Sequence, residues 1–210
     1  MRPTRPILSL AGVLLASALA QPAHAANTEP DWPCMQRKVP ELSLAQVWNG
    51  PNLPDSAKNW SDDEDIARRV EDLAARRLPL EDAEQQIKDF AASLPPDKLT
   101  PKMTMLEQGL FDHMDAERSR VISGIGRYAS KQIDLAAQLR KEQSEADKLR
   151  AKPDADPKQV AALTDQLTVE TRIFDERVKS LTYVCEVPTL IEQRLYQLSK
   201  TIAEILAPKK

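Results

Sequence analysis

Proline is absent from residues 102–152 of this chain, and that uninterrupted stretch constrains the fold more than any other feature. Thr100 and Pro101 have the pattern of an N-cap and a first helical position, so we expect a helix over residues 101–151. At 1.5 Å per residue such a helix is roughly 75 Å long, well beyond the usual length in a globular protein. Its apolar residues recur every three or four positions, which is typical of a coiled-coil seam.

A second long amphipathic stretch covers residues 157–206, after the polar turn KPDADPKQ. Because the connection is short, we expect the two long helices to be antiparallel neighbours. Two shorter helices are expected over residues 61–78 and 80–94, the first starting at a capping box formed by Ser61 and Glu64. These helices are too short to cover the hairpin, so its distal part, near residues 130–175, should project from a small bundle.

Residues 26–60 differ from the rest because they are rich in proline and contain Trp32, Trp48 and Trp60, all of the chain's tryptophans. Proline interrupts helical hydrogen bonding, so a continuous helix is excluded here. Tryptophan is costly to expose to water, which favours an ordered arm packed along the helices. The expected fold is therefore all-α: a small bundle and a long antiparallel, coiled-coil-like hairpin within residues 61–210, with a proline- and tryptophan-rich N-terminal arm.

The first 25 residues have the pattern of a secretory signal. Arg2 and Arg5 precede an apolar stretch, and Ala23-His24-Ala25 fits a signal-peptidase site. We therefore expect cleavage near Ala25 and a periplasmic or secreted protein. The apolar stretch is too short for a stable anchor, and no later stretch is long enough to span a bilayer, so we expect no transmembrane segment in the mature chain.

The chain has two cysteines, Cys34 and Cys185, which an exported protein would carry into an oxidising compartment. The competing hypothesis, a redox or metal-ligating cysteine, lacks any Cys-x-x-Cys motif to support it. A single bridge would close a loop of roughly 150 residues, which the chain-entropy model equates with about 5 kcal/mol of stability. We expect this disulfide to fasten the arm to the last helix, where Pro188 should bend the helix around it.

Signs of catalysis are scarce in the sequence. His113 is the only histidine left after signal cleavage, and no metalloprotease, phosphate-loop or nucleophile-elbow motif occurs. Loss of the two signal arginines takes the net charge from −3 to −5, so a basic footprint for nucleic acid is missing. We therefore expect a protein that is not an enzyme, has no cofactor and does not bind nucleic acid.

The best candidate ligand site consists of Met103, Met105, His113 and Met114, which lie within a short stretch that Glu117 follows. Thioether and imidazole groups suit copper, and an exported location is where a copper carrier would act. The alternative is structural, because Met103 and Met114 belong to the apolar seam and methionine packs well as a flexible hydrophobic residue.

A second candidate is a basic cluster, Arg118, Arg120 and Arg127, which would receive an anion or an acidic partner. The alternative is an ordinary solvated helix face on which Asp115 and Glu117 balance the arginines.

The leading hypothesis is an exported, non-catalytic interaction or scaffolding protein that uses the hairpin to hold a partner. That partner would be another exported or envelope protein, or a second copy of the chain. The alternative is a periplasmic carrier of copper or a small ligand, with its site near Met103–Glu117. A carrier requires a pocket lined jointly by Met103, Met105 and His113, whereas a scaffold requires exposed apolar area on the distal part of the hairpin.

Overall fold

The computed structural model describes residues 32–208, and all regular structure within that range is helical. The expected signal and its cleavage site, like residues 209–210, lie outside the described residues. Along the chain the elements are α1 (Leu44–Val47), the 3₁₀ helix η1 (Asp55–Asp62), α2 (Glu64–Ala74), α3 (Leu80–Ser93), α4 (Pro96–Arg150) and α5 (Pro157–Leu206). The predicted all-α fold, with its long antiparallel hairpin and disulfide-stapled arm, is confirmed.

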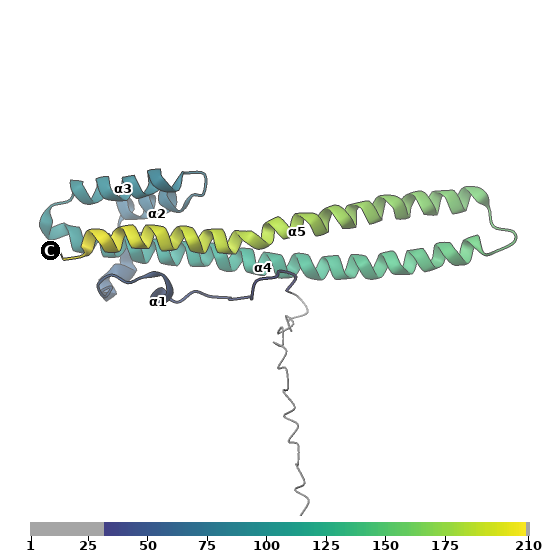
Figure 1. Cartoon of the computed structure of the whole chain (residues 1–210), viewed down its shortest axis with the longest axis horizontal. Helices are drawn as coiled ribbons and strands as arrows, with labels where there is room; N and C mark the ends of the chain where they lie inside the picture. Colours follow the sequence, from purple (N-terminus) through teal and green to yellow (C-terminus); the bar gives the residue numbers. More distant parts are fainter. Residues whose placement is uncertain (1–31, 209–210) are drawn as a thin grey trace, which may run out of the picture.

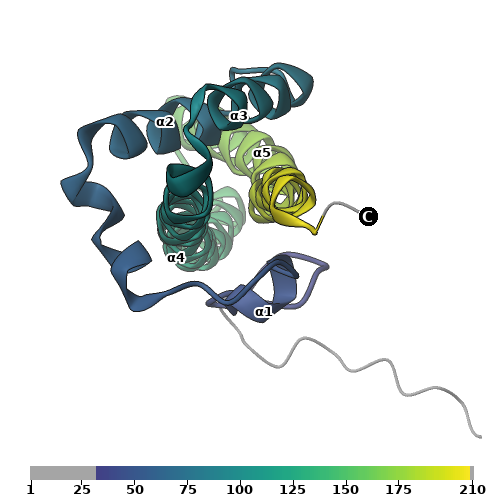
Figure 2. The ribbon, with the colours of Figure 1, turned by 90° about the vertical axis from the view of Figure 1, so that its left-hand side faces the viewer.

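Three layers make up one half of the molecule, which we call the base. The α4–α5 hairpin forms the middle layer, with α2 and α3 on one side and the arm with α1 on the other (Figures 1 and 2). The main core lies between these layers and consists of apolar side chains from all five α-helices. Its largest fully buried members are Ile66, Ile87, Met103, Leu106, Leu110, Met114, Ile191, Leu195, Leu198 and Ile202.

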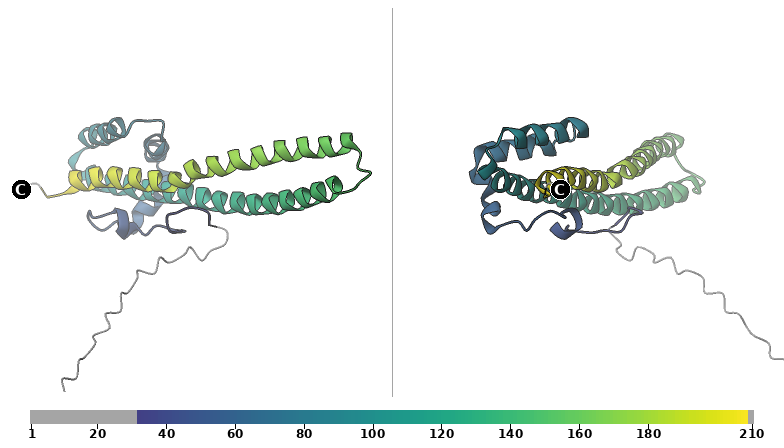
Figure 3. Two further views of the ribbon diagram at one scale, coloured as in Figure 1. Left: turned by 45° about the vertical axis from the view of Figure 1, so that its right-hand side comes forward. Right: turned by 60° about the vertical axis from the view of Figure 1, so that its left-hand side comes forward.

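The other half of the hairpin runs from the region of the Cys34–Cys185 disulfide to the turn between α4 and α5. It extends beyond α2, α3 and the arm, and we call it the finger (Figure 3). Its seam is only partly apolar. Leu167 and Ala146 are buried there, but Gln132 is also buried and donates a 3.4 Å hydrogen bond to the carbonyl of Phe174. The finger therefore has a thinner apolar seam than the base, and among the described residues α4 and α5 alone build it.

Two helix starts differ from the sequence prediction. Helix α4 begins at Pro96 and not at Pro101, because the Pro95-Pro96 pair already supplies an extended N-cap and a first-turn proline. Pro101 consequently lies inside the helix. The capping box at Ser61 was also wrong: that residue belongs to η1, and Asp63 caps α2 by accepting a 3.2 Å hydrogen bond from the amide of Ile66.

The ends of the remaining helices lie close to their expected positions. Helix α2 stops at Ala74, four residues before the predicted end, and α3 covers Leu80–Ser93. Helix α5 covers Pro157–Leu206 and contains the buried Pro188. Proline has no amide hydrogen to donate to the preceding turn, which favours a bend, and α5 changes direction where the base meets the finger (Figure 1).

Candidate binding surfaces

The predicted disulfide joins the arm to α5. Cys34 and Cys185 are bonded with their Cα atoms 5.5 Å apart, and both side chains are buried. They form a second, small apolar cluster with Trp32, Ile122 and Ile125, separate from the main core. This cluster lies where the base meets the finger, so the bridge closes the base at the point from which the finger projects.

Side chains of α4 hold the extended backbone of the arm. Arg118 donates a 2.7 Å hydrogen bond to the carbonyl of Val39, and Ser119 donates one of 3.0 Å to the carbonyl of Pro40. The carboxylate of Asp115 accepts a 3.0 Å hydrogen bond from the amide of Leu42. Because these bonds replace those of regular secondary structure, the arm is ordered without being a helix or a strand.

Between the arm and α5 lies a groove of about 440 Å³, which we call the arm groove. Its size falls in the range of small-ligand sites. The arm contributes Trp32, Gln36, Arg37, Val39, Gln46 and Val47, α4 contributes Arg118 and Ile122, and α5 contributes Pro188, Thr189, Glu192, Gln193, Tyr196 and Gln197. The lining combines aromatic rings, four glutamine amides, two cations and one carboxylate, so the groove is suited to a polar ligand.

The structure separates the three arginines that the sequence suggested as one basic surface. Arg118 is only 4% exposed, whereas Arg120 and Arg127 are exposed. At about 100° per residue, both exposed arginines lie roughly 160–180° around α4 from Arg118. Arg118 therefore belongs to the arm groove, and the expectation of one shared arginine surface was wrong.

The four residues suggested as copper ligands do not come together either. Met103 and Met114 are fully buried in the main core, Met105 packs against it from its edge, and His113 is half-buried. On the α4 wheel Met105 and His113 lie about 160° and 80° away from Met103. The joint pocket that the carrier hypothesis requires is not formed by these side chains.

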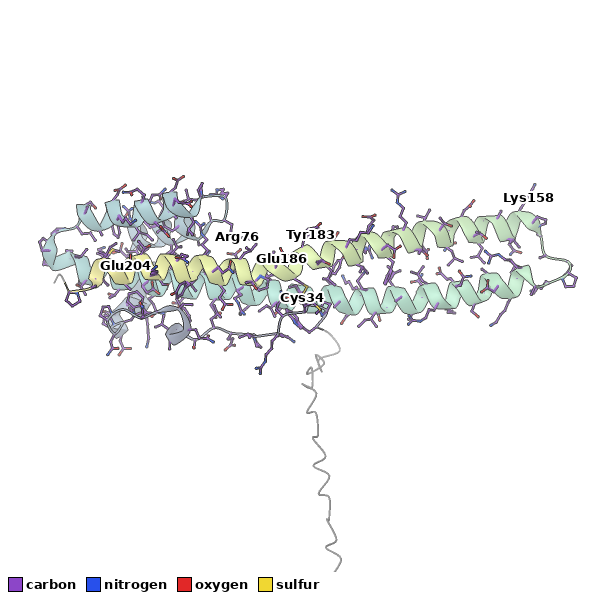
Figure 4. The ribbon with its side chains drawn as sticks, viewed as in Figure 1. Cys34, Arg76, Lys158, Tyr183, Glu186 and Glu204 are labelled. Carbon is purple, nitrogen blue, oxygen red and sulfur yellow. A yellow bond between two sulfur atoms is a disulfide. The ribbon has the colours of Figure 1, made fainter. Side chains whose placement is uncertain are left out.

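A surface that the sequence prediction missed follows the outer side of α5 in the finger. Val169 is 57% exposed, Ile173 43%, Tyr183 75% and Val184 42%. A shallow groove of about 380 Å³ runs beside the first two, lined by Val169, Arg172, Ile173, Glu176, Arg177 and Ser180. We call these eight residues the α5 stripe. Figure 4 marks Tyr183 on the side of α5 that faces away from α4.

The α5 stripe continues a face that is covered in the base. Arg194 lies about seven helical turns from Val169, so both residues point to the same side of α5. In the base that side meets α2 and the following loop, where Arg194 donates hydrogen bonds to the carbonyls of Leu73 and Leu78. In the finger no other element within residues 32–208 covers it (Figure 1). The signal in the sequence was a second apolar period on α5, beside the one that faces α4.

Comparisons with known proteins supply no relative: no family model, curated protein or solved structure matches this chain. Within residues 32–208 no helix has both the length and the apolar character needed to cross a membrane.

Proposed function

We propose that this chain is an exported, non-catalytic interaction protein in which the base carries a finger that holds a partner. The observation that supports this proposal most directly is the α5 stripe. Val169 and Ile173 expose apolar surface beside a shallow groove, and Tyr183 and Val184 expose a second apolar patch farther along the same side of α5. Exposed apolar surface that is contiguous and flanked by charged residues is characteristic of protein–protein binding sites.

The partner that best fits the stripe is an amphipathic helix of another exported or envelope protein. Val169 and Ile173, and again Tyr183 and Val184, lie on one side of α5, which suits ridges-into-grooves packing of a second helix. In the base the same side of α5 carries Arg194, which donates hydrogen bonds to the carbonyls of Leu73 and Leu78. Arg172 and Arg177 outnumber Glu176 along the groove, so the partner helix should carry acidic residues beside its apolar seam.

The alternative of a copper carrier near Met103–Glu117 gains no support from the geometry. Two of its four suggested ligands fill the main core, and the other two lie on different sides of α4. We therefore keep the interaction protein as the single proposal.

Native mass spectrometry of the mature protein, gently purified from an exporting host, tests the proposal. The wild-type chain should carry a partner, and a Val169→Asp, Ile173→Asp variant should lose at least tenfold of that complex because the charges oppose apolar docking. Ile133→Asp is a matched control, since Ile133 is similarly exposed at 51% but lies on α4 and not on α5. A wild-type chain with no partner at any concentration, or a complex equally sensitive to both substitutions, would contradict the proposal.

A mass equal to two copies of the chain, lost in the stripe variant, would retain the stripe as the docking site. In that case the partner on the stripe would be a second copy of this chain and not a helix of another protein.

A further inference from the structure

The buried guanidinium of Arg118 is not fully satisfied. One terminal nitrogen donates to the carbonyl of Val39, but Nε is buried and has no hydrogen-bond acceptor. Desolvating a charged donor without a partner costs free energy comparable to a lost hydrogen bond or more. The wall of the arm groove therefore contains a cation with an unused donor.

The nearest carboxylate does not supply the missing bond. Glu192 reaches to 3.6 Å from Nε, which is longer than a hydrogen bond, and its side chain is 45% exposed. The acids nearest to Arg118 on α4 itself are engaged elsewhere. Asp115 accepts a hydrogen bond from the amide of Leu42, and Glu117 forms an ion pair with Arg76. Glu192 thus covers Arg118 only loosely, and its exposed carboxylate is free to turn into solvent.

We propose that the arm groove binds a ligand carboxylate, which takes the place of Glu192 on Arg118. A carboxylate matches the planar donor edge of a guanidinium, and a charge-assisted bond in a desolvated groove is among the stronger polar contacts. Arg37 adds a second cation to the lining. The ligand is either a free small carboxylate or the C-terminal carboxylate of a peptide.

The rest of the lining fits a polar, extended ligand. Gln193 and Gln197 offer amide donors and acceptors, and Tyr196 offers a half-exposed ring. The amides of Gln36 and Gln46 are already engaged, because Gln36 donates to the carbonyl of Cys185 and Gln46 accepts from the amide of Ser43. The α5 residues of the groove, from Pro188 to Gln197, cover roughly 14 Å at 1.5 Å per residue. That length accommodates about four residues of an extended peptide. This site is separate from the α5 stripe, so it does not depend on the function proposed above.

Isothermal titration of the mature protein tests the proposal with three probes: glutarate, a tetrapeptide of alanine with a free C-terminus, and the same peptide amidated. We expect at least one free carboxylate to bind and the amidated peptide to bind at least tenfold more weakly. Binding of glutarate identifies a free small carboxylate as sufficient, and binding of the free peptide alone identifies a C-terminus. No binding of either carboxylate at millimolar concentration would overturn the proposal, as would equal binding of the amidated peptide.

Substitutions separate recognition from folding. Glu192→Ala removes the competing carboxylate and should tighten binding several-fold, while the bond from Arg118 to the arm stays intact. Arg118→Gln should weaken binding more than tenfold. Arg120→Gln, on the opposite side of α4, is the control and should change nothing. A Glu192→Ala variant that binds the carboxylate probes no better than the wild type would overturn the role of Arg118. That is the result expected if Arg118 only holds the arm and does not contact the ligand.

Discussion

Glu107 is buried in the base and has no oppositely charged partner there. It is 0% exposed; Ser199 donates a 2.8 Å hydrogen bond to its Oε1, and its Oε2 has no partner. Burial raises the pKa of Glu107 to about 8, and the hydrogen bond from Ser199 offsets only part of that rise. The side chain is therefore protonated in the folded protein at neutral pH.

This protonation makes stability depend on pH. The folded pKa lies above the value of 4.5 for a free glutamate, so folding takes up a proton between these two values. The contribution of the protonated Glu107 side chain to the free energy of unfolding is fully present below pH 4.5 and is lost as the pH rises toward 8. Glu107→Gln, which has nearly the same shape and no charge, should raise the free energy of unfolding by about 3 kcal/mol at pH 7 and hardly change it at pH 4.5. Urea unfolding at both pH values measures this, and an equal effect at both would contradict it.

At the level of the helix, two of the three glycines in α4 have opposite surroundings. A Cβ added to Gly109 would lie 2.6 Å from a methyl group of Val70 and 2.9 Å from the ring of Trp60. A Cβ on Gly124 would meet only the end of Arg127, at 3.9 Å. Gly109 thus lets α2 and η1 approach α4, and the indole of Trp60 then donates a 2.9 Å hydrogen bond to Asp112.

Gly109→Ala should lower the free energy of unfolding by about 1–2 kcal/mol, because overpacking outweighs the better helix propensity of alanine. The matched variant Gly124→Ala has room for its methyl group and should raise the free energy of unfolding by about 0.5–1 kcal/mol. Urea midpoints of both variants measure the difference, and a stabilising Gly109→Ala would show that Val70 and Trp60 move aside at little cost.

The sequence predicted the helices well where proline and apolar spacing decide the outcome. It failed at the start of α4, because Pro96 and Pro101 both suit a first turn and only the neighbouring α3 shows which one is used. For the candidate surfaces it identified the pairing of Cys34 with Cys185, but it grouped Arg118 with two arginines that lie on the other side of α4. It did not place Glu192 beside Arg118, because that contact depends on how the hairpin pairs. It also overlooked the α5 stripe, because a second apolar face cannot be distinguished from core until the neighbouring helices are placed.

At the level of the molecule, the disulfide, the arm and the α2–α3 layer all stabilise the base, whereas the finger consists of α4 and α5 alone in the part of the chain that the structure describes (Figure 1). If the finger docks a partner as proposed, a base held in this way would lower the entropic cost of docking by limiting the motion of the end from which the finger projects. We propose that the partner contacts the outer side of α5.

Site-specific photo-crosslinking in the exporting host tests this claim most directly. A photoreactive amino acid is introduced at Ile173 in one variant and at Val178, on the other side of the same helix, in a second. We predict that the Ile173 variant forms a single covalent adduct with a helical segment of one partner and that the Val178 variant forms at least tenfold less of it. Equal adduct formation at both positions, or none at Ile173, would contradict the claim.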